Sequence, residues 1–151
     1  MSDGTDTGLR MKSTNFMGGG ARNVTFRDSA IRNTVKQGVI MTLDYHDPNA
    51  ILDYKRSTVP GQFRDIRVAN VTIEDAAGAA IQVKGDSAHD AFHENVAFAL
   101  VRFKGRAGAQ IDGLRNSSFS DVSFAGAEGD PWNIEGSEGL RFDRVEPQPR
   151  Q

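Results

Sequence analysis

Two cations near the start of the chain are the first residues whose types and spacing could do chemistry. Arg10 and Lys12 alternate with apolar side chains in the segment 8–12. Successive side chains of a β-strand point to opposite faces, so the alternation predicts that both cations share one outer face. There they could bind carboxylates, because a guanidinium offers a bidentate fork and an ammonium adds a point charge. The other interpretation is that both are solvated strand residues.

A second group of reactive side chains lies in the segment 44–54. Asp44, His46 and Asp53 are weak catalytic candidates there, because a carboxylate beside an imidazole can perform acid–base work. Polar residues are also ordinary at the entrance of a surface loop, and we favour that interpretation. No catalytic residue is therefore assigned from residue types alone.

The remaining candidates for metal or cofactor chemistry are few. His89 and His93 are four residues apart among acidic neighbours and would share one face of a helix, but a solvated turn is the favoured interpretation. The chain has no cysteine, which excludes disulfides, thiolate metal sites and a cysteine nucleophile. Neither a phosphate-binding loop nor a nucleophilic serine motif is present. The sequence therefore predicts no metal and no cofactor.

A repeat indicates which elements position these residues. Its pattern is Asn or Asp, a β-branched residue, any residue, and then Phe or Val. It reads Asn23-Val24-Thr25-Phe26, Asp65-Ile66-Arg67-Val68, Asn95-Val96-Ala97-Phe98 and Asp121-Val122-Ser123-Phe124, with a looser fifth copy at 140–145. The apolar residues of each copy lie two apart, which is the period of a half-buried strand. A second apolar stretch follows most copies, and a third follows a glycine-bearing turn; the segment 8–12 has the pattern of such a third strand.

Three short strands and three turns per repeat predict an all-β fold, a right-handed parallel β-helix of about four to five coils. The intervals from Val24 to Ile66, Val96 and Val122 are 42, 30 and 26 residues, and an inserted loop at about 44–62 accounts for the first. Residues 1–151 are expected to form a single domain. A β-sandwich is the alternative, but the hairpin turns that join sandwich strands are absent from the sequence.

Composition narrows the possible partners. Lys and Arg number 18 against 20 Asp and Glu, a net charge of −2, so the basic face that nucleic-acid binding requires is not expected. No apolar run approaches the roughly 20 residues of a membrane span. The first eight residues are polar and lack the apolar core of a signal peptide. No nucleic-acid or membrane partner is predicted, and the compartment stays open.

Three segments resemble glycoside hydrolase family 28, the polygalacturonases. Gly8-Leu9-Arg10-Met11-Lys12 is similar to the family's G-[I/V]-R-[I/V]-K stretch. A glycine-rich turn at 18–20 and the strand Arg22-Asn23-Val24-Thr25-Phe26 follow, as in the family. The segment 39–45 resembles the family segment that ends in an active-site tyrosine, here Tyr45. Beyond Phe63 the chain keeps the family's spacing of short strands and turns but contains no diagnostic motif.

The resemblance implies a role for each matching residue. Arg10 and Lys12 would contact the galacturonate at the cleavage site, and Tyr45 would line the same cleft, so the expected partner is an acidic, uronide-containing polysaccharide. The family places its catalytic acids upstream, in an N-T-D segment and an Asp-Asp pair, followed by a G-H-G histidine. None of these motifs occurs in the chain. Hydrolysis would therefore require missing upstream coils. Members of the family are usually secreted or periplasmic.

A β-helix that begins at the Arg-x-Lys strand would expose apolar residues and unpaired strand edges at its first coil. Such edges invite pairing, so we expect a homo-oligomer through the open end of the solenoid. Three alternatives to the polygalacturonase-like interpretation remain. They are a non-catalytic carbohydrate-binding module, a self-assembling β-helix, and a different hydrolytic activity built on the segment 44–54.

Overall fold

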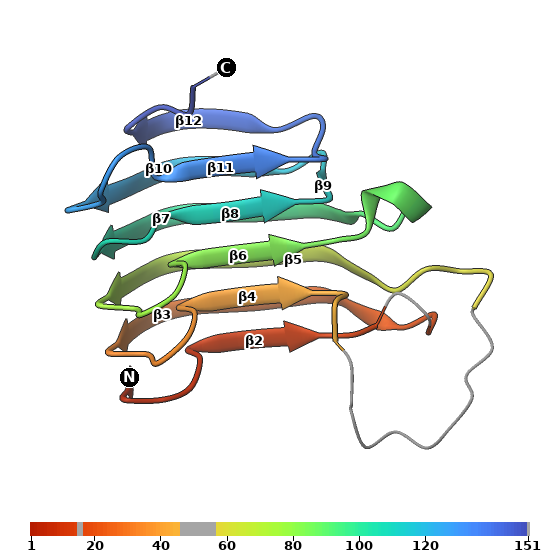
Figure 1. The fold of residues 1–151 in the computed structure, drawn as a ribbon, viewed down its shortest axis with the longest axis horizontal. Coiled ribbons are helices and arrows are strands. Elements are labelled where there is room, and N and C mark those ends of the chain that lie inside the picture. The colour runs from red at the N-terminus through yellow and green to blue at the C-terminus, as the bar shows by residue number, and fades with distance from the viewer. Residues whose placement is uncertain (15–16, 46–56, 151) are drawn as a thin grey trace.

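The structure is a computed structural model that describes residues 1–14, 17–45 and 57–150. Its strands form two sheets, and successive coils stack from the N-terminal to the C-terminal end, with sheet B in front of sheet A in Figure 1. In sheet A the neighbouring strands are, in order, β1 (Ser2–Asp3), β3 (Gly20–Arg32), β5 (Gln62–Glu74), β7 (His93–Lys104), β10 (Ser118–Ala125) and β12 (Arg141–Glu146), with β9 (Leu114–Arg115) beside β7. In sheet B the neighbouring strands are, in order, β2 (Leu9–Lys12), β4 (Val39–Thr42), β6 (Ile81–Lys84), β8 (Ala109–Asp112) and β11 (Trp132–Glu135).

Every pairing between these strands is parallel. This confirms the predicted all-β parallel β-helix and excludes the sandwich, whose strands pair antiparallel. In the described part of the chain the only helical segment is a 3₁₀ turn at Ser87–His89, and no helix there is long and apolar enough to cross a membrane.

The strands of sheet A bend at residues with positive φ, which recur every five positions. These residues stack in three columns, and each column forms one corner of the solenoid. The first column is Asn23, Asp65, Asn95, Asn116 and Gly139; the second is Asp28, Asn70, Leu100, Asp121 and Arg144; the third is Gly4, Asn33, Asp75, Gly105 and Gly126. Two of the three predicted strands per coil are therefore the arms of one bent strand.

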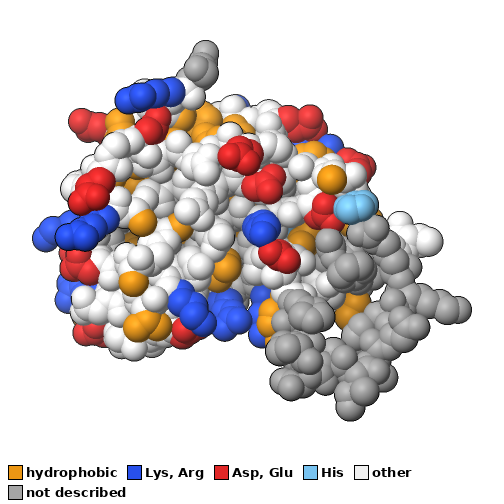
Figure 2. Space-filling view, viewed as in Figure 1, with side chains coloured by type: hydrophobic (Ala, Val, Ile, Leu, Met, Phe, Trp, Pro, Cys, Tyr) orange, Lys and Arg blue, Asp and Glu red, His pale blue; other side chains and the backbone are white. Residues whose placement is uncertain are grey.

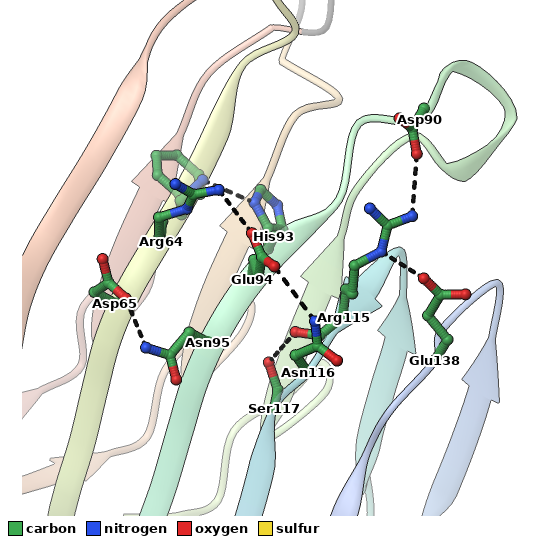
Figure 3. A network of polar contacts seen from close by, with 11 residues as sticks. Arg64, Asp65, Asp90, His93, Glu94, Asn95, Arg115, Asn116, Ser117 and Glu138 are labelled. Atoms are coloured by element: carbon green, nitrogen blue, oxygen red, sulfur yellow. Dashed lines mark hydrogen bonds and ion pairs between the residues drawn. The ribbon is translucent and has the colours of Figure 1, made fainter.

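Asparagine and aspartate suit these corners for two reasons. Their short polar side chains tolerate the left-handed conformation better than other residues with a Cβ. They also hydrogen-bond to one another between coils: the side-chain amide of Asn70 donates to Asp28 at 2.7 Å, and that of Asn95 donates to Asp65 at 2.6 Å (Figure 3). The Asn or Asp at the head of each sequence repeat is thus a corner that fixes the direction of the chain.

The register corrects one predicted repeat. Phe119 pairs with Phe98, which places Asp121 beside Leu100 in the second column and not beside Asn95. The segment 121–124 is therefore the second arm of its coil, and the predicted interval of 26 residues is wrong. Both arms begin after a positive-φ corner and continue with alternating apolar residues, so their sequences look alike.

Coil length varies along the solenoid. Core positions that stack on one another are separated by 42, 30, 21 and 23 residues, from Phe26 through Val68, Phe98 and Phe119 to Phe142. The connection from sheet A to sheet B is short throughout, at 33–38, 75–80, 105–108 and 126–131. The connection from sheet B back to sheet A ranges from residue 113 alone, between β8 and β9, to 43–61. One edge of the solenoid therefore takes up nearly all the variation in length.

Aromatic rings fill the C-terminal half of the core. Phe98, Phe119 and Phe142 stack with centroid separations of 5.1 and 5.2 Å, and Trp132 meets Phe119 edge-on at 5.2 Å. The indole Nε1 of Trp132 donates to the carbonyl of Pro147 at 2.7 Å, which satisfies its polar atom. Stacked and edge-on rings add roughly 0.5–1.5 kcal/mol per pair beyond the burial of their area.

A fully buried imidazole, His93, joins the two sheets on the opposite side of the core. Its Nδ1 accepts the backbone N–H of Phe63 in β5 at 3.1 Å, and its Nε2 lies 3.2 Å from the carbonyl of Lys84 at the end of β6. The ring also stacks on that of Phe63, with centroids 4.9 Å apart. Burial lowers the pKa of His93 to about 4, outweighing the bond to Lys84 that favours the proton. The neutral ring is thus part of the fold.

We expect Leu100→Asn to raise the free energy of unfolding by about 1 kcal/mol, because a bulky residue at φ 54° is strained and asparagine is not. Leu100 is 49% exposed, so little apolar contact is lost. The new amide would also lie between Asn70 and Asp121 in the second column. Urea denaturation measures the change. Asn70→Leu is the matched reverse variant and should lower stability; a Leu100→Asn protein no more stable than the parent would contradict the corner argument.

The buried His93 predicts acid sensitivity between pH 6.5 and 4. The unfolded chain takes up the imidazole proton near its ordinary pKa of 6.5, while the folded chain resists it until about pH 4, so stability falls as pH falls through this window. The full loss is about 3 kcal/mol. His93→Gln keeps a donor and an acceptor but cannot titrate, so its stability should change less with pH. A His93→Gln profile equal to the parent's would refute this assignment.

Candidate functional site

The outward face of sheet B begins at β2, where Arg10 and Lys12 are both exposed. Leu9 and Met11, between them, pack against the core from the other side of the strand. The structure therefore brings the two cations to one face, as the alternation of the segment predicts.

Tyr45 lies beside Lys12. The Nζ of Lys12 lies 3.8 Å from the centroid of the Tyr45 ring, and the backbone N–H of Tyr45 donates to the carbonyl of Ser13 at 3.2 Å. Thr14 and Asp44 form an antiparallel bridge that holds the two chain segments together after β2 and β4. A cation over an exposed aromatic face is worth roughly 0.5–1 kcal/mol, so the ring helps to fix the position of the ammonium group.

Two carboxylates pair with neighbouring cations around this pair. Asp6 lies 3.6 Å from the guanidinium of Arg10 and 3.0 Å from the ammonium of Lys36. Asp44 pairs with Lys84, the residue at the end of β6. All five of these groups are partly exposed to solvent, so each pair contributes little to stability. Their effect is to order the charged side chains.

These residues line a cavity of about 250 Å³. Its charged side chains are the cations Arg10, Lys12, Lys36 and Lys84 and the carboxylates Asp6 and Asp44, a net charge of four minus two, or +2. Figure 2 shows lysine and arginine side chains gathered over the lower part of this face, near β2. The cavity can therefore attract an anionic ligand, and Tyr45 offers it an aromatic surface.

Two rows of outward residues continue along sheet B from Arg10 and Lys12. The parallel register places one residue per strand in each row. The first row is Arg10, Ile40, Gln82, Gln110 and Asn133; the second is Lys12, Thr42, Lys84, Asp112 and Glu135. In the first row three amides therefore follow Ile40, and in the second row two carboxylates follow Lys84.

The predicted catalytic candidates do not form a catalytic group among the described residues. Asp44 pairs with Lys84 and projects toward solvent, with its side chain 65% exposed. His46 and Asp53 lie outside the described residues. Within residues 1–14, 17–45 and 57–150 no His, Asp or Glu side chains gather as they would around a metal ion.

The structure also separates His89 from His93. His89 is exposed on the 3₁₀ turn, and its Nδ1 lies 2.7 Å from Asp86, whereas both ring nitrogens of His93 face backbone groups inside the core. Because His93 faces the core and not the surface, the two imidazoles cannot share a metal. His89 therefore lies on an exposed turn, and His93 is a residue of the core.

A network of charged groups at the variable edge binds neighbouring coils together (Figure 3). Arg64 donates to Glu94 at 2.7 Å, and Asn116 donates to the same carboxylate at 3.3 Å. The hydrogen bond from Arg64 is the main reason that the pKa of Glu94 lies below its usual value. Arg115 pairs with Asp90 and Glu138 in the next connections. These groups are paired with one another, which indicates a structural role.

Sequence reasoning missed three charged residues of the cavity: Asp6, Lys36 and Lys84. A signal for Lys84 was present, because Ile81-Gln82-Val83-Lys84 repeats the spacing of the segment 9–12 and the register stacks the two. Asp6 and Lys36 lie in connections, where no periodic pattern predicts the direction of a side chain.

Comparison with known proteins agrees with this architecture. An exo-poly-α-D-galacturonosidase of Dickeya chrysanthemi is 40% identical over 133 residues, which are 85% of this chain and 22% of that protein. A family 28 exopolygalacturonase structure from Yersinia enterocolitica superposes with a TM-score of 0.78 at 40% identity, over 98% of this chain and 26% of the other. The chain thus spans about a quarter of the length of these relatives. The sequence profile of glycosyl hydrolases family 28 matches residues 2–140, so this chain belongs to that family.

Proposed function

We propose that the chain forms the polygalacturonate-binding part of a pectin-degrading family 28 β-helix. The observation that carries the proposal is the pair of exposed cations on β2, Arg10 and Lys12, inside a cavity of net charge +2. The relatives named for galacturonosidase activity support the choice of an acidic sugar as ligand.

Each residue has a distinct role in this proposal. Arg10 forms a bidentate contact with the carboxylate of a galacturonate unit, and Lys12 supplies a second charge-assisted hydrogen bond. Tyr45 holds the ammonium of Lys12 and presents its ring to the apolar face of the sugar. Asp6 already occupies one side of the Arg10 guanidinium, so an incoming carboxylate binds at the other side or displaces it.

Hydrolysis needs further groups. Inverting glycosidases place a carboxylic acid and a carboxylate base about 6.5–9.5 Å apart, with the attacking water between the base and the sugar. The two carboxylates of the cavity, Asp6 and Asp44, are both paired with cations. In this proposal the chain binds and orients the sugar acid, and the catalytic carboxylates belong to coils outside these 151 residues.

We expect Arg10→Ala combined with Lys12→Ala to weaken binding of oligogalacturonate about a hundredfold, since contacts to charged groups are worth roughly 1.5 kcal/mol each. Titration calorimetry measures the dissociation constant. Added salt should weaken binding to the parent, because screening acts on exposed charges.

The matched control is Arg67→Ala combined with Arg102→Ala, which removes two exposed cations from sheet A. It should leave affinity unchanged. An equal loss of affinity in both double variants would show that the binding is nonspecific charge attraction. A reducing-sugar assay on the same proteins should detect no hydrolysis. Release that disappears in Asp44→Asn would instead favour an activity built on the segment 44–54.

We also propose that the β2 end of the solenoid associates with further strands, in a homo-oligomer of this chain. The outer strands there are unpaired on one side, and the apolar residues behind them are only partly buried: Leu9, Met11, Ala21, Val24 and Phe26. Uncovered strand edges and apolar surface favour pairing with another β-structure.

Light scattering of the purified chain should therefore give a mass above 16.4 kDa. Met11→Glu places a charge in the proposed contact and should shift the distribution toward the monomer. Leu100→Glu, which places the same charge at an exposed apolar residue of β7, is the control. A parent protein that stays monomeric at high concentration would refute the association.

A further inference from the structure

The cavity around Arg10 continues along the outer face of sheet B. A second cavity of about 260 Å³ lies over β6, β8 and β11, and it shares Gln82 and Lys84 with the first. From β2 to β11 the face spans four strand spacings, or roughly 19 Å at about 4.8 Å each. This length exceeds that of one sugar ring, so a bound oligosaccharide that lies across the strands extends from the first cavity into the second.

The two cavities differ in charge. The first cavity has a net charge of +2. In the second cavity the charged side chains are the shared Lys84 and two carboxylates, Asp112 and Glu135, so negative charge is in excess. Among the described residues neither carboxylate forms an ion pair, while Lys84 pairs with Asp44. Figure 2 shows acidic side chains over the upper part of this face, above the basic side chains near β2. A carboxylate that enters the second cavity therefore meets like charge.

The polar groups of the second cavity suit a neutral sugar. Gln82, Gln110 and Asn133 project from adjacent strands as a row of amides, and each amide can both donate to and accept from a hydroxyl. Gln37 donates to Gln82 at 2.8 Å, and Gln82 lies 3.5 Å from Gln110, so the row is partly ordered before a ligand binds. Asp112 and Glu135 are acceptors that hydroxyls can satisfy and carboxylates cannot.

We infer that this face selects successive sugar units by their charge: it binds a uronate carboxylate at Arg10 and Lys12 and an uncharged sugar unit over β8 and β11. This inference rests on the proposed function, because the first cavity must bind galacturonate. The preferred ligand is then a galacturonan in which charged and uncharged units coexist, as in a partly methyl-esterified chain, and not a fully charged one.

The test compares three oligomers of equal length at low salt: fully de-esterified oligogalacturonate, its partly methyl-esterified form, and a neutral galactose oligomer. The parent should bind the partly esterified oligomer about threefold more tightly than the fully charged one, the size expected for relief of exposed like-charge contacts. The neutral oligomer should bind weakly, since it offers no carboxylate to Arg10 and Lys12.

Asp112→Asn combined with Glu135→Gln should abolish the preference by raising affinity for the fully charged oligomer alone. Asp75→Asn combined with Glu146→Gln removes two charges of the same kind, one just after β5 and one at the end of β12, and should leave the preference intact. Circular dichroism confirms that each variant folds.

The outcomes separate this inference from the proposed function. If the parent binds both acidic oligomers equally, or if the Asp112 and Glu135 double variant keeps the preference, the inference is wrong and the proposed function stands. If the control variant loses the preference as well, the effect belongs to net charge and the inference is again wrong. If no galacturonate oligomer binds, both fail.

Discussion

The positive-φ corners of sheet A control the geometry on which everything else depends. Asparagine, aspartate and glycine place a bend every five residues, and the bends of successive coils stack in register. Because the corners coincide, the strands between them pair in parallel and the apolar residues of every coil enter the same narrow core. Hydrogen bonds between corner side chains, such as Asn70 to Asp28 and Asn95 to Asp65, reinforce the stacking.

The same register builds the candidate site from residues distant in sequence. Arg10, Lys36 and Lys84 belong to three different coils, yet they line one cavity because their strands and connections stack. The outward rows of sheet B then present one side chain per strand, at the regular spacing of paired strands. A polymeric ligand that lies across such a face meets a sequence of chemical environments determined by the order of the coils.

Much of the fold could be predicted from the sequence, because alternation and corner residues are local signals. The repeat of Asn or Asp followed by alternating apolar residues revealed the coils, and the segment 8–12 placed Arg10 and Lys12 outward. The register between neighbouring coils was harder to predict. Asp121 was assigned to the first corner instead of the second, because both arms carry the same local pattern.

The candidate site could be predicted only in part, since its completion depends on contacts between coils. Tyr45 beside Lys12 followed from the resemblance to family 28, whereas Asp6 and Lys36 lie in connections without periodicity. His93 shows the limit most clearly: it looked like a loop residue beside His89, but strand β7 begins at His93 and turns the ring into the core. Whether a polar residue faces solvent depends on where a strand begins, and such boundaries are weakly encoded.

The uneven lengths of the two connections bear on how such a solenoid can change. The connections from sheet A to sheet B are short, at 33–38, 75–80, 105–108 and 126–131. The return connection ranges from residue 113 alone to 43–61 without disturbing the register of the strands beside it. Loop closure costs grow only slowly with length, so the return edge can accept or lose residues at little cost in stability. This edge adjoins the end of β2 and β4 where Lys12 and Tyr45 meet. The molecule thus keeps the connections of one edge nearly constant in length and leaves the other edge, beside the candidate site, open to evolutionary insertion.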